Sequence, residues 1–188
     1  MHSHPSDLRR LARPLALALT GLAIAAVPAS AGSGGTATPT SGDGSDRAGC
    51  TARHDAQLDN GKATIPCDAP DRVADTIQAA NRIAKGYPYC YGGGHASFRD
   101  NCYDCSGAVS YALHGGRFVN SPMPSGSYMN WGRKGRGSWI TVFANDGHVY
   151  AKIAGLRWDT SMTAGAGPGW SKQNRSSSGF RVRHPKGF

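Results

Sequence analysis

The sequence predicts an α+β domain in which two helices precede the strands of a small antiparallel sheet. Apolar residues recur at near-helical spacing between residues 71 and 85, and a second apolar stripe follows Asp104. From Trp139 onward β-branched and aromatic residues are frequent, and residues 148–153 alternate apolar with polar, which is typical of strands with one buried face. Helices first and strands second favour an α+β architecture over one that alternates the two kinds of element.

The first helix is expected between Asp71 and Lys85. Asp71 and Asp75 lie early in this segment and Lys85 lies late, a distribution that complements the helix dipole. Gly86 then provides a stop signal.

The second helix is expected to begin after Asp104, whose short carboxylate side chain can accept a hydrogen bond from the first turn. An apolar stripe continues to about His114, and two glycines end the helix. Residues 121–137, which are rich in proline and glycine, are expected to form a loop. Cys105 is therefore the expected first residue of this helix.

Four segments in the second half favour strands. Residues 139–143 are rich in β-branched and aromatic side chains, and residues 148–153 alternate apolar with polar. Ala154-Gly155 can turn the chain into a further strand at residues 156–160, and alternation over residues 180–183 suggests a short last strand. These strands are expected to form the antiparallel sheet.

The chain divides into four predicted regions. Residues 1–31 have a basic start, an apolar middle and a small-residue cleavage site, which is typical of a secretory signal peptide. The apolar run is shorter than the about 20 residues that span a bilayer, so we expect no membrane span after cleavage; an uncleaved anchor is the alternative. Residues 32–49 predict a flexible Gly/Ser/Thr linker. Residues 50–70 are expected to form a disulfide-stapled segment, and residues 71–188 the main domain.

Five cysteines in an exported chain leave one without a partner. Cys50 and Cys67 close a segment with few apolar residues, where a disulfide would contribute about 3 kcal/mol in the chain-entropy model. Two disulfides among four cysteines would leave Cys105 as a free thiol. A buried inert cysteine, or a further disulfide partner, is the alternative for Cys105.

The formal net charge is +9, and no acidic residue follows Asp159. A basic protein outside the cell is expected to meet polyanions such as a cell wall rich in carboxylates and phosphates, although the charge could serve solubility alone. Nucleic acid is a less favoured partner, because no binding motif accompanies the charge. The absence of glutamate also disfavours a glycosidase, which usually needs a pair of carboxylates.

Cys105 has the features of a thiol nucleophile. The first turn of a helix stabilises an anion through unpaired N–H groups and the helix dipole, and the thiolate is the reactive form of cysteine. Ser106 and Gly107 are small, so a substrate could approach closely. The unpaired N–H of Cys105 would also face a developing oxyanion.

His148 is the preferred base, because it begins an alternating strand beside a glycine. His95 lies nearer to Cys105 in sequence and is the competing candidate; contact with substrate or solvent is its other interpretation. If residues 154–155 form a two-residue turn, Asp159 falls on the same face as His148, diagonally across the two strands. Asp159 would then orient the imidazole, but a one-residue slip would make it an exposed strand-end carboxylate.

Three short motifs together give a family resemblance. Residues 89–93 read Tyr-Cys-Tyr-Gly-Gly, residues 104–107 read Asp-Cys-Ser-Gly, and residues 147–149 read Gly-His-Val. In this order they resemble the NlpC-type cell-wall cysteine peptidases over roughly residues 72–162. The resemblance implies a compact papain-like domain in which the helix with the nucleophile packs on a small antiparallel sheet.

The resemblance also implies roles for single residues. Cys105 matches the nucleophile, His148 matches the base, and Tyr89 matches a tyrosine whose hydroxyl lies near the reacting carbonyl. The third polar position falls near Asp159, where the family usually has histidine, asparagine or glutamine, and aspartate could perform the same task. Further expected contacts to the substrate or its oxyanion are Ser106, Tyr91 and His95. No metal and no cofactor are expected.

The implied activity is hydrolysis of amide bonds in peptidoglycan stem peptides through a thioacyl-enzyme. The protein would be a secreted, cell-wall-associated monomer whose partners are peptidoglycan and anionic wall polymers. The same site could instead serve a transpeptidase or acyltransferase, and a non-catalytic wall-binding module could retain the scaffold. Groove-lining candidates, each of which could equally pack in the core or a loop, are Tyr87, Tyr91, Trp131 and Trp170.

The chain departs from the family pattern in two places. The spacing from Tyr89 to Cys105 is longer than usual, and Cys90 and Cys102 flank the extra residues. A disulfide between these two cysteines would fix the loop beside the nucleophile. Residues 136–138 read Arg-Gly-Ser where the family has Pro-Gly-Asp.

Overall fold

The structure, a computed structural model, describes residues 49–51, 54–162 and 166–188. The predicted signal peptide at residues 1–31 and nearly all of the predicted linker at residues 32–49 lie outside the described residues. The described residues belong to a single compact unit. Within them, no helix is both long and apolar enough to cross a membrane.

Both predicted helices are present, together with a third, short one. α1 spans Asp71–Ile83 and α2 spans Cys105–Gly115. α1 ends before the predicted Lys85, because Ala84 is extended and Lys85 has a positive φ of 58°. α3, a single turn at Ser125–Tyr128, lies where the sequence predicts only a loop.

Six of the eight strands in the described residues form an antiparallel sheet with the order β3-β8-β4-β5-β6-β7. The α+β class and the small antiparallel sheet are therefore confirmed. The sequence did not predict β3 or β7, which are only two and three residues long. The strand bounds are β3 Arg133–Lys134, β4 Ile140–Ala144, β5 Val149–Ile153, β6 Leu156–Asp159, β7 Gly169–Ser171 and β8 Arg181–His184.

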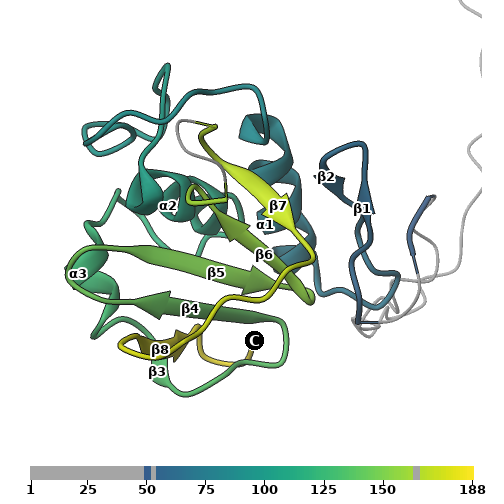
Figure 1. Ribbon diagram of the computed structural model, residues 1–188. Coiled ribbons are helices and arrows are strands. Elements are labelled where there is room, and N and C mark those ends of the chain that lie inside the picture. The colour runs from purple at the N-terminus through teal and green to yellow at the C-terminus, as the bar shows by residue number, and fades with distance from the viewer. Residues whose placement is uncertain (1–48, 52–53, 163–165) are drawn as a thin grey trace, which may run out of the picture. The chain divides into compact units, whose positions relative to one another are not determined.

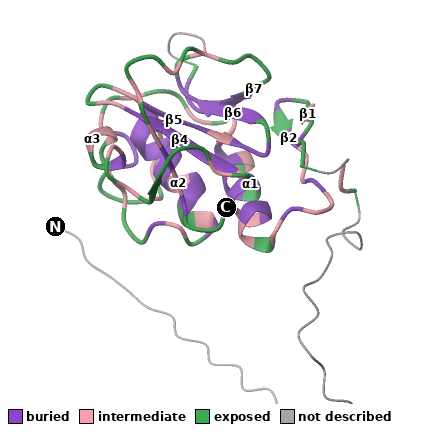
Figure 2. Ribbon diagram, turned by 90° about the horizontal axis from the view of Figure 1, so that it is seen from below, coloured by how far each residue is buried: buried purple, intermediate pink, exposed green. Residues whose placement is uncertain are grey.

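Helices α1 and α2 pack together on one face of the sheet, with α2 against β5 and β6, while the connection from β7 to β8 crosses the opposite face (Figure 1). The alternation in β5 is as predicted: Val149, Ala151 and Ile153 are fully buried in the core. The helices and the central strands carry most of the buried residues (Figure 2). Trp158 on β6 is also fully buried, and its indole Nε1 donates a hydrogen bond to the Ala108 carbonyl of α2 at 3.0 Å.

The turn between β5 and β6 confirms the predicted hairpin. Ala154 and Gly155 both have positive φ, of 45° and 85°, which is the requirement of a two-residue type I′ turn. The register pairs Ile153 with Leu156. Because the turn sets the register, the start of β5 at Val149 and the end of β6 at Asp159 lie at the same edge of the hairpin.

The N-terminal segment is stapled by the predicted Cys50–Cys67 disulfide. It also contains a small hairpin of β1 (Leu58–Asp59) and β2 (Lys62–Ala63), which the sequence did not predict. The segment attaches to the main domain through backbone hydrogen bonds, for example from Ala56 N–H to the Ala154 carbonyl at 2.9 Å. It therefore contributes buried alanines to the common core and is no separate domain.

We expect Trp158→Phe to lower the free energy of unfolding by about 1–2 kcal/mol, since it removes a buried hydrogen bond and part of the ring volume. Urea unfolding followed by circular dichroism measures this change. Trp131→Phe is the matched control, because Trp131 is only partly buried and packs on the edge of Tyr128. An equal loss in both variants would contradict a special role of Trp158 in holding α2 on the sheet.

Candidate active site

Cys105 is the first residue of α2 and is 8% exposed. All five cysteines lie in the described residues, and Cys105 is the one that is not in a disulfide. Its N–H group is among the first in the helix, which have no acceptor within the helix. The thiol therefore lies beside donors and the positive end of a helix dipole, as the sequence predicts.

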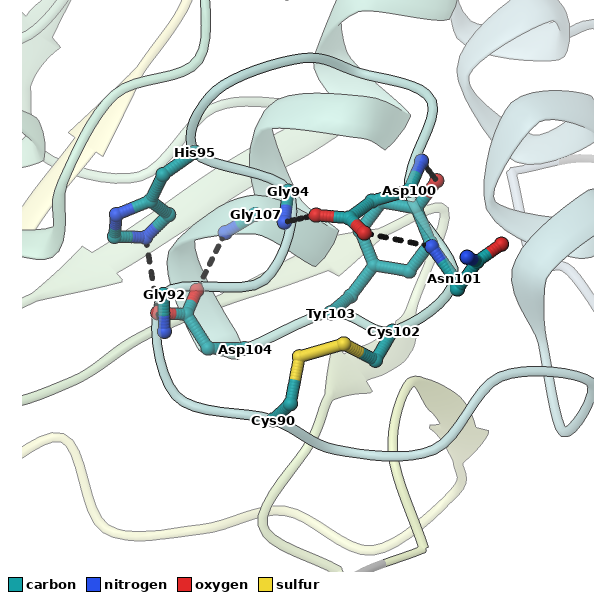
Figure 3. The surroundings of a disulfide bond; sticks show 10 residues. All are labelled: Cys90, Gly92, Gly94, His95, Asp100, Asn101, Cys102, Tyr103, Asp104 and Gly107. Carbon is teal, nitrogen blue, oxygen red and sulfur yellow. Dashed lines mark hydrogen bonds and ion pairs between the residues drawn. A yellow bond between two sulfur atoms is a disulfide. The ribbon is translucent and has the colours of Figure 1, made fainter.

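Asp104 is the N-cap of α2, and its carboxylate connects the helix to the preceding loop. Oδ1 accepts hydrogen bonds from Gly107 N–H at 2.8 Å and from the Ser106 hydroxyl at 3.0 Å. Oδ2 accepts one from Gly92 N–H at 3.1 Å and contacts His95 Nε2 at 2.9 Å (Figure 3). The predicted cap is confirmed, and the carboxylate also anchors the loop beside Cys105.

His95 is bound to groups other than the thiol. Its Nε2 lies 2.9 Å from the Asp104 carboxylate and 2.8 Å from the Ser106 hydroxyl. The ring is thereby held at the cap of α2, and neither contact involves Cys105. His95 is thus better described as a support of the N-cap than as the competing base.

The loop before α2 is closed by the Cys90–Cys102 disulfide, which the sequence predicts (Figure 3). The loop contacts the helix so closely that a Cβ atom on Gly107 would lie 2.0 Å from the Gly93 carbonyl oxygen. Only glycine fits there. The disulfide and the glycine together hold residues 90–102 against the first turn of α2.

His148 directly precedes β5, and its Nε2 lies 2.9 Å from Oδ1 of Asp159, the last residue of β6. The hairpin register thus produces the predicted contact between His148 and Asp159. Since Nε2 is engaged, the other ring nitrogen, Nδ1, is left for the thiol of Cys105. The side chain of His148 is 19% exposed and that of Asp159 is fully buried.

Asp159 is surrounded by donors. Oδ1 also accepts the N–H groups of Thr160 and Ser161, at 2.8 and 3.1 Å. Oδ2 accepts the Ser161 hydroxyl at 2.9 Å and Arg175 Nη1 at 3.2 Å. This network fixes the carboxylate in one orientation, so the imidazole that binds it is fixed as well.

Burial alone would lower the pKa of His148, but hydrogen bonds and charge interactions with Asp159 and Cys105 outweigh this effect and raise it to about 9. Burial would likewise raise the pKa of Asp159, but its bonds to His148 and Ser161 lower it to about 2. At neutral pH the pair is therefore an imidazolium bound to a carboxylate. A protonated imidazole beside a cysteine favours the thiolate.

The other residues predicted to contact the substrate or its oxyanion, Tyr89, Tyr91 and Ser106, differ in how far they are exposed. The pKa of Tyr89 is raised by partial burial and by the charges of Cys105 and Asp104, and the side chain is 40% exposed. Tyr91 is 95% exposed. Ser106 is 2% exposed and its hydroxyl donates to the Asp104 carboxylate, so its side chain takes part in the cap of α2; contact with substrate or its oxyanion stays a prediction.

Of the aromatic groove candidates, Trp170 is a core residue, so the alternative of core packing holds for it. It is 4% exposed, packs on Trp158 with ring centroids 4.9 Å apart, and donates Nε1 to Asn81. Tyr87 packs edge-on against Tyr103. Sequence reasoning also missed Arg175, which lies in a segment with no periodic pattern that could have placed it near Asp159.

No protein-family model matches the sequence, and no curated protein matches it. Among solved structures, the chain is similar to the P60 domain of an antigen from M. avium subspecies paratuberculosis, with 24% identity and a TM-score of 0.47, over 60% of this chain and 94% of that one. The likeness is to the NlpC/p60 fold, the type that the three motifs resemble.

Two further solved structures are similar. A mutated form of the resuscitation-promoting-factor-interacting protein RipA has 21% identity and a TM-score of 0.46, over 69% of this chain and 70% of that one. RipD from Mycobacterium tuberculosis is described as a non-catalytic NlpC/p60 domain protein adapted to peptidoglycan binding. It has 18% identity and a TM-score of 0.43, over 60% of this chain and 96% of that one. All three identities are below 25%, and all three TM-scores are below 0.5.

We expect Cys105 to be alkylated by iodoacetamide at pH 6 faster than an unactivated thiol, because an imidazolium and a helix N-terminus both favour the thiolate. His148→Ala should slow this reaction roughly tenfold, and mass spectrometry of the modified peptide measures it. His114→Ala is the matched control, since His114 lies at the far end of α2. Equal rates in the wild type and His148→Ala would show that His148 does not activate the thiol.

Proposed function

We propose that this protein is a secreted cysteine hydrolase that cleaves amide bonds in the stem peptides of peptidoglycan. The observation that carries the proposal is a free thiol at the start of α2 with a His148–Asp159 pair beside it. A nucleophile, a base within reach and a third group that orients the base are the parts of a nucleophilic triad. In this proposal Cys105 is the nucleophile, His148 the acid–base group and Asp159 the orienting residue.

The reaction proceeds in two steps. The Cys105 thiolate attacks the amide carbonyl carbon, and the proton on His148 passes to the leaving amine as the C–N bond breaks, which leaves a thioacyl-enzyme. His148, now neutral, takes a proton from water. The hydroxide adds to the thioester, the C–S bond breaks, and the product acid and the starting ion pair are formed.

Two groups would bind the oxyanion that develops during each step. The N–H of Cys105 lies in the first turn of α2, where donors point out of the helix. The Tyr89 hydroxyl is the second candidate, because Tyr89 matches the motif tyrosine whose hydroxyl lies near the reacting carbonyl. Asp159 meanwhile keeps the imidazole in the orientation that both proton transfers require.

The choice of peptidoglycan rests on the motif resemblance and on the charge of the chain. The net charge of +9 suits an anionic wall, and RipD is described as adapted to peptidoglycan binding. The two disulfides favour an oxidising compartment and accord with export by the predicted signal peptide at residues 1–31. Secretion and wall association are part of this proposal.

A non-catalytic wall-binding module is the second candidate, because RipD is described as such a protein. A transferase that uses the same thioacyl intermediate is the third. The His148–Asp159 pair favours a catalytic role, since a binding module has no need of a protonated imidazole bound to a buried carboxylate.

Incubation of the mature protein with purified peptidoglycan should release stem-peptide fragments, which mass spectrometry identifies by the mass of one added water per cleaved bond. Cys105→Ala should release none, because it lacks the nucleophile. Cross-linked or acylated products would instead identify a transferase. Binding to peptidoglycan with no fragments from the wild type would identify a non-catalytic module.

Turnover of a synthetic stem peptide should fall as the pH rises through about 9, because His148 then loses the proton that the leaving amine needs. Asp159→Asn removes the negative charge that raises the pKa of His148, so the falling limb should move to lower pH by about one unit or more. Initial rates across the pH range measure this shift.

Asp159→Ala removes the charge and the hydrogen bond together, so turnover should fall roughly a hundredfold as the imidazole loses its orientation. Asp146→Ala is the matched control, since Asp146 is exposed. Turnover of Asp159→Ala equal to that of the wild type would show that another group orients His148. A falling limb at the same pH in the wild type and in Asp159→Asn would show that Asp159 does not raise the pKa of His148.

A further inference from the structure

The face of the sheet opposite α1 and α2 carries a cavity of ≈ 280 Å³. It lies beneath the connection from β7 to β8, which crosses this face in Figure 1. The residues come from β4, β5, β6 and two loops, so the cavity is built on the rigid centre of the sheet. The lining residues are Arg136, Phe143, Tyr150, Lys152, Arg157, Asn174, Arg175 and Ser177.

Four of these eight residues are cations, and none is a carboxylate. The aromatic rings of Phe143 and Tyr150 stack 4.6 Å apart and form part of the wall. The guanidinium of Arg136 lies over Phe143, 5.2 Å from the ring centroid, and that of Arg175 lies over Tyr150 at 5.1 Å. The rings thus hold both guanidinium groups beside the cavity.

Asp159 is the one carboxylate found within salt-bridge distance of these cations among the described residues. It binds Arg175 and lies 3.6 Å from Arg157 Nε, but it also neutralises the protonated His148. Four cations and His148 therefore share a single negative charge. Such an excess of positive charge in a partly enclosed site is costly unless an anion balances it.

The cations also have free hydrogen-bonding capacity. Arg157 is nine-tenths buried, yet within the described part of the chain its Nε has no hydrogen-bond partner. Lys152 Nζ donates to the Asn174 side-chain oxygen at 3.0 Å, which leaves further donors on the ammonium group. A buried donor without an acceptor indicates a place where a ligand oxygen can bind.

We propose that this cavity is a binding site for a phosphate group. A phosphate offers several oxygens and up to two negative charges, and guanidinium groups bind it in a forked, bidentate geometry. A carboxylate has only two oxygens and one charge, which fits four converging cations less well. The cavity lies on the face of the sheet opposite α2 and adjoins the candidate active site, because Arg157 and Arg175 also contact Asp159, but neither Cys105 nor His148 lines it.

Two sources could supply this group: a free phosphate ion or small ester, and a phosphodiester polymer of the kind that accompanies cell walls. The cavity volume of ≈ 280 Å³ is ample for one phosphate group. Arg136, which lines the cavity, is exposed, so the cavity can be reached from the surface. The proposal is independent of catalysis. It would stand even if the protein cleaved no peptide bond.

The test is isothermal titration of the mature protein at pH 7 and low ionic strength with inorganic phosphate, a glycerol-phosphate diester polymer and acetate. The double variant Arg136→Gln/Lys152→Gln should weaken phosphate binding roughly tenfold or more, because each charged hydrogen bond contributes strongly to binding. Arg133→Gln/Lys134→Gln removes the same charge from exposed positions on β3 and should leave the affinity within about twofold.

Several results would overturn the proposal: no phosphate binding by the wild type, equal weakening in both double variants, or acetate that binds as tightly as phosphate. Polymer binding that is lost only in Arg136→Gln/Lys152→Gln would support the site and identify a wall polymer as its source. Binding of inorganic phosphate without the polymer would support the site and identify a small phosphate. Both double variants replace partly or fully exposed side chains, and circular dichroism checks that they remain folded.

Discussion

The packing of α2 against β5 and β6 is the contact on which the candidate site depends. Cys105 comes from the helix, whereas His148 and Asp159 come from the sheet, so no site forms unless the two layers are held in one position. Trp158 fixes that position, because its indole is fully buried and bonds to the carbonyl of Ala108 in the first turn of α2. A displacement of about an ångström between nucleophile and base is enough to abolish efficient catalysis.

Two buried aspartates organise the two halves of the site in the same physical way. Asp104 fixes the start of α2 and the disulfide-closed loop, and Asp159 fixes the imidazole. Each carboxylate is held by several donors, since a buried charge with unfilled acceptors would be strongly destabilising. The chain thus uses the same device, a buried carboxylate bound by several donors, to hold the proposed nucleophile and the proposed base.

The sequence was most informative where local geometry decides the outcome. The two turn residues at 154–155 were sufficient to predict the β5–β6 register, and the position of Asp159 follows from it. The N-cap role of Asp104 and the start of α2 were predictable for the same reason, because short-range hydrogen bonds decide both.

Features that depend on distant parts of the chain could not be predicted. β7 has three residues and no alternation, and it is defined by its pairing with β6. For Trp170 the sequence left groove and core equally open, because its burial depends on contacts with Trp158 and with Asn81, which is far away in sequence. Arg175 contacts Asp159 from an irregular segment. The four cations that line the cavity come from four segments that are separate in sequence, so only the folded structure brings them together.

The Cys90–Cys102 disulfide has a consequence for oxidative folding. Cys102 lies only three positions before Cys105, so a reduced chain that folds under oxidising conditions can join the wrong pair of cysteines and lose its free thiol. Burial of Cys105 within the first turn of α2 opposes this error, because the thiol is then inaccessible to a partner. The order of events therefore matters: formation of α2 and its cap before oxidation of the loop preserves the one thiol that the site requires.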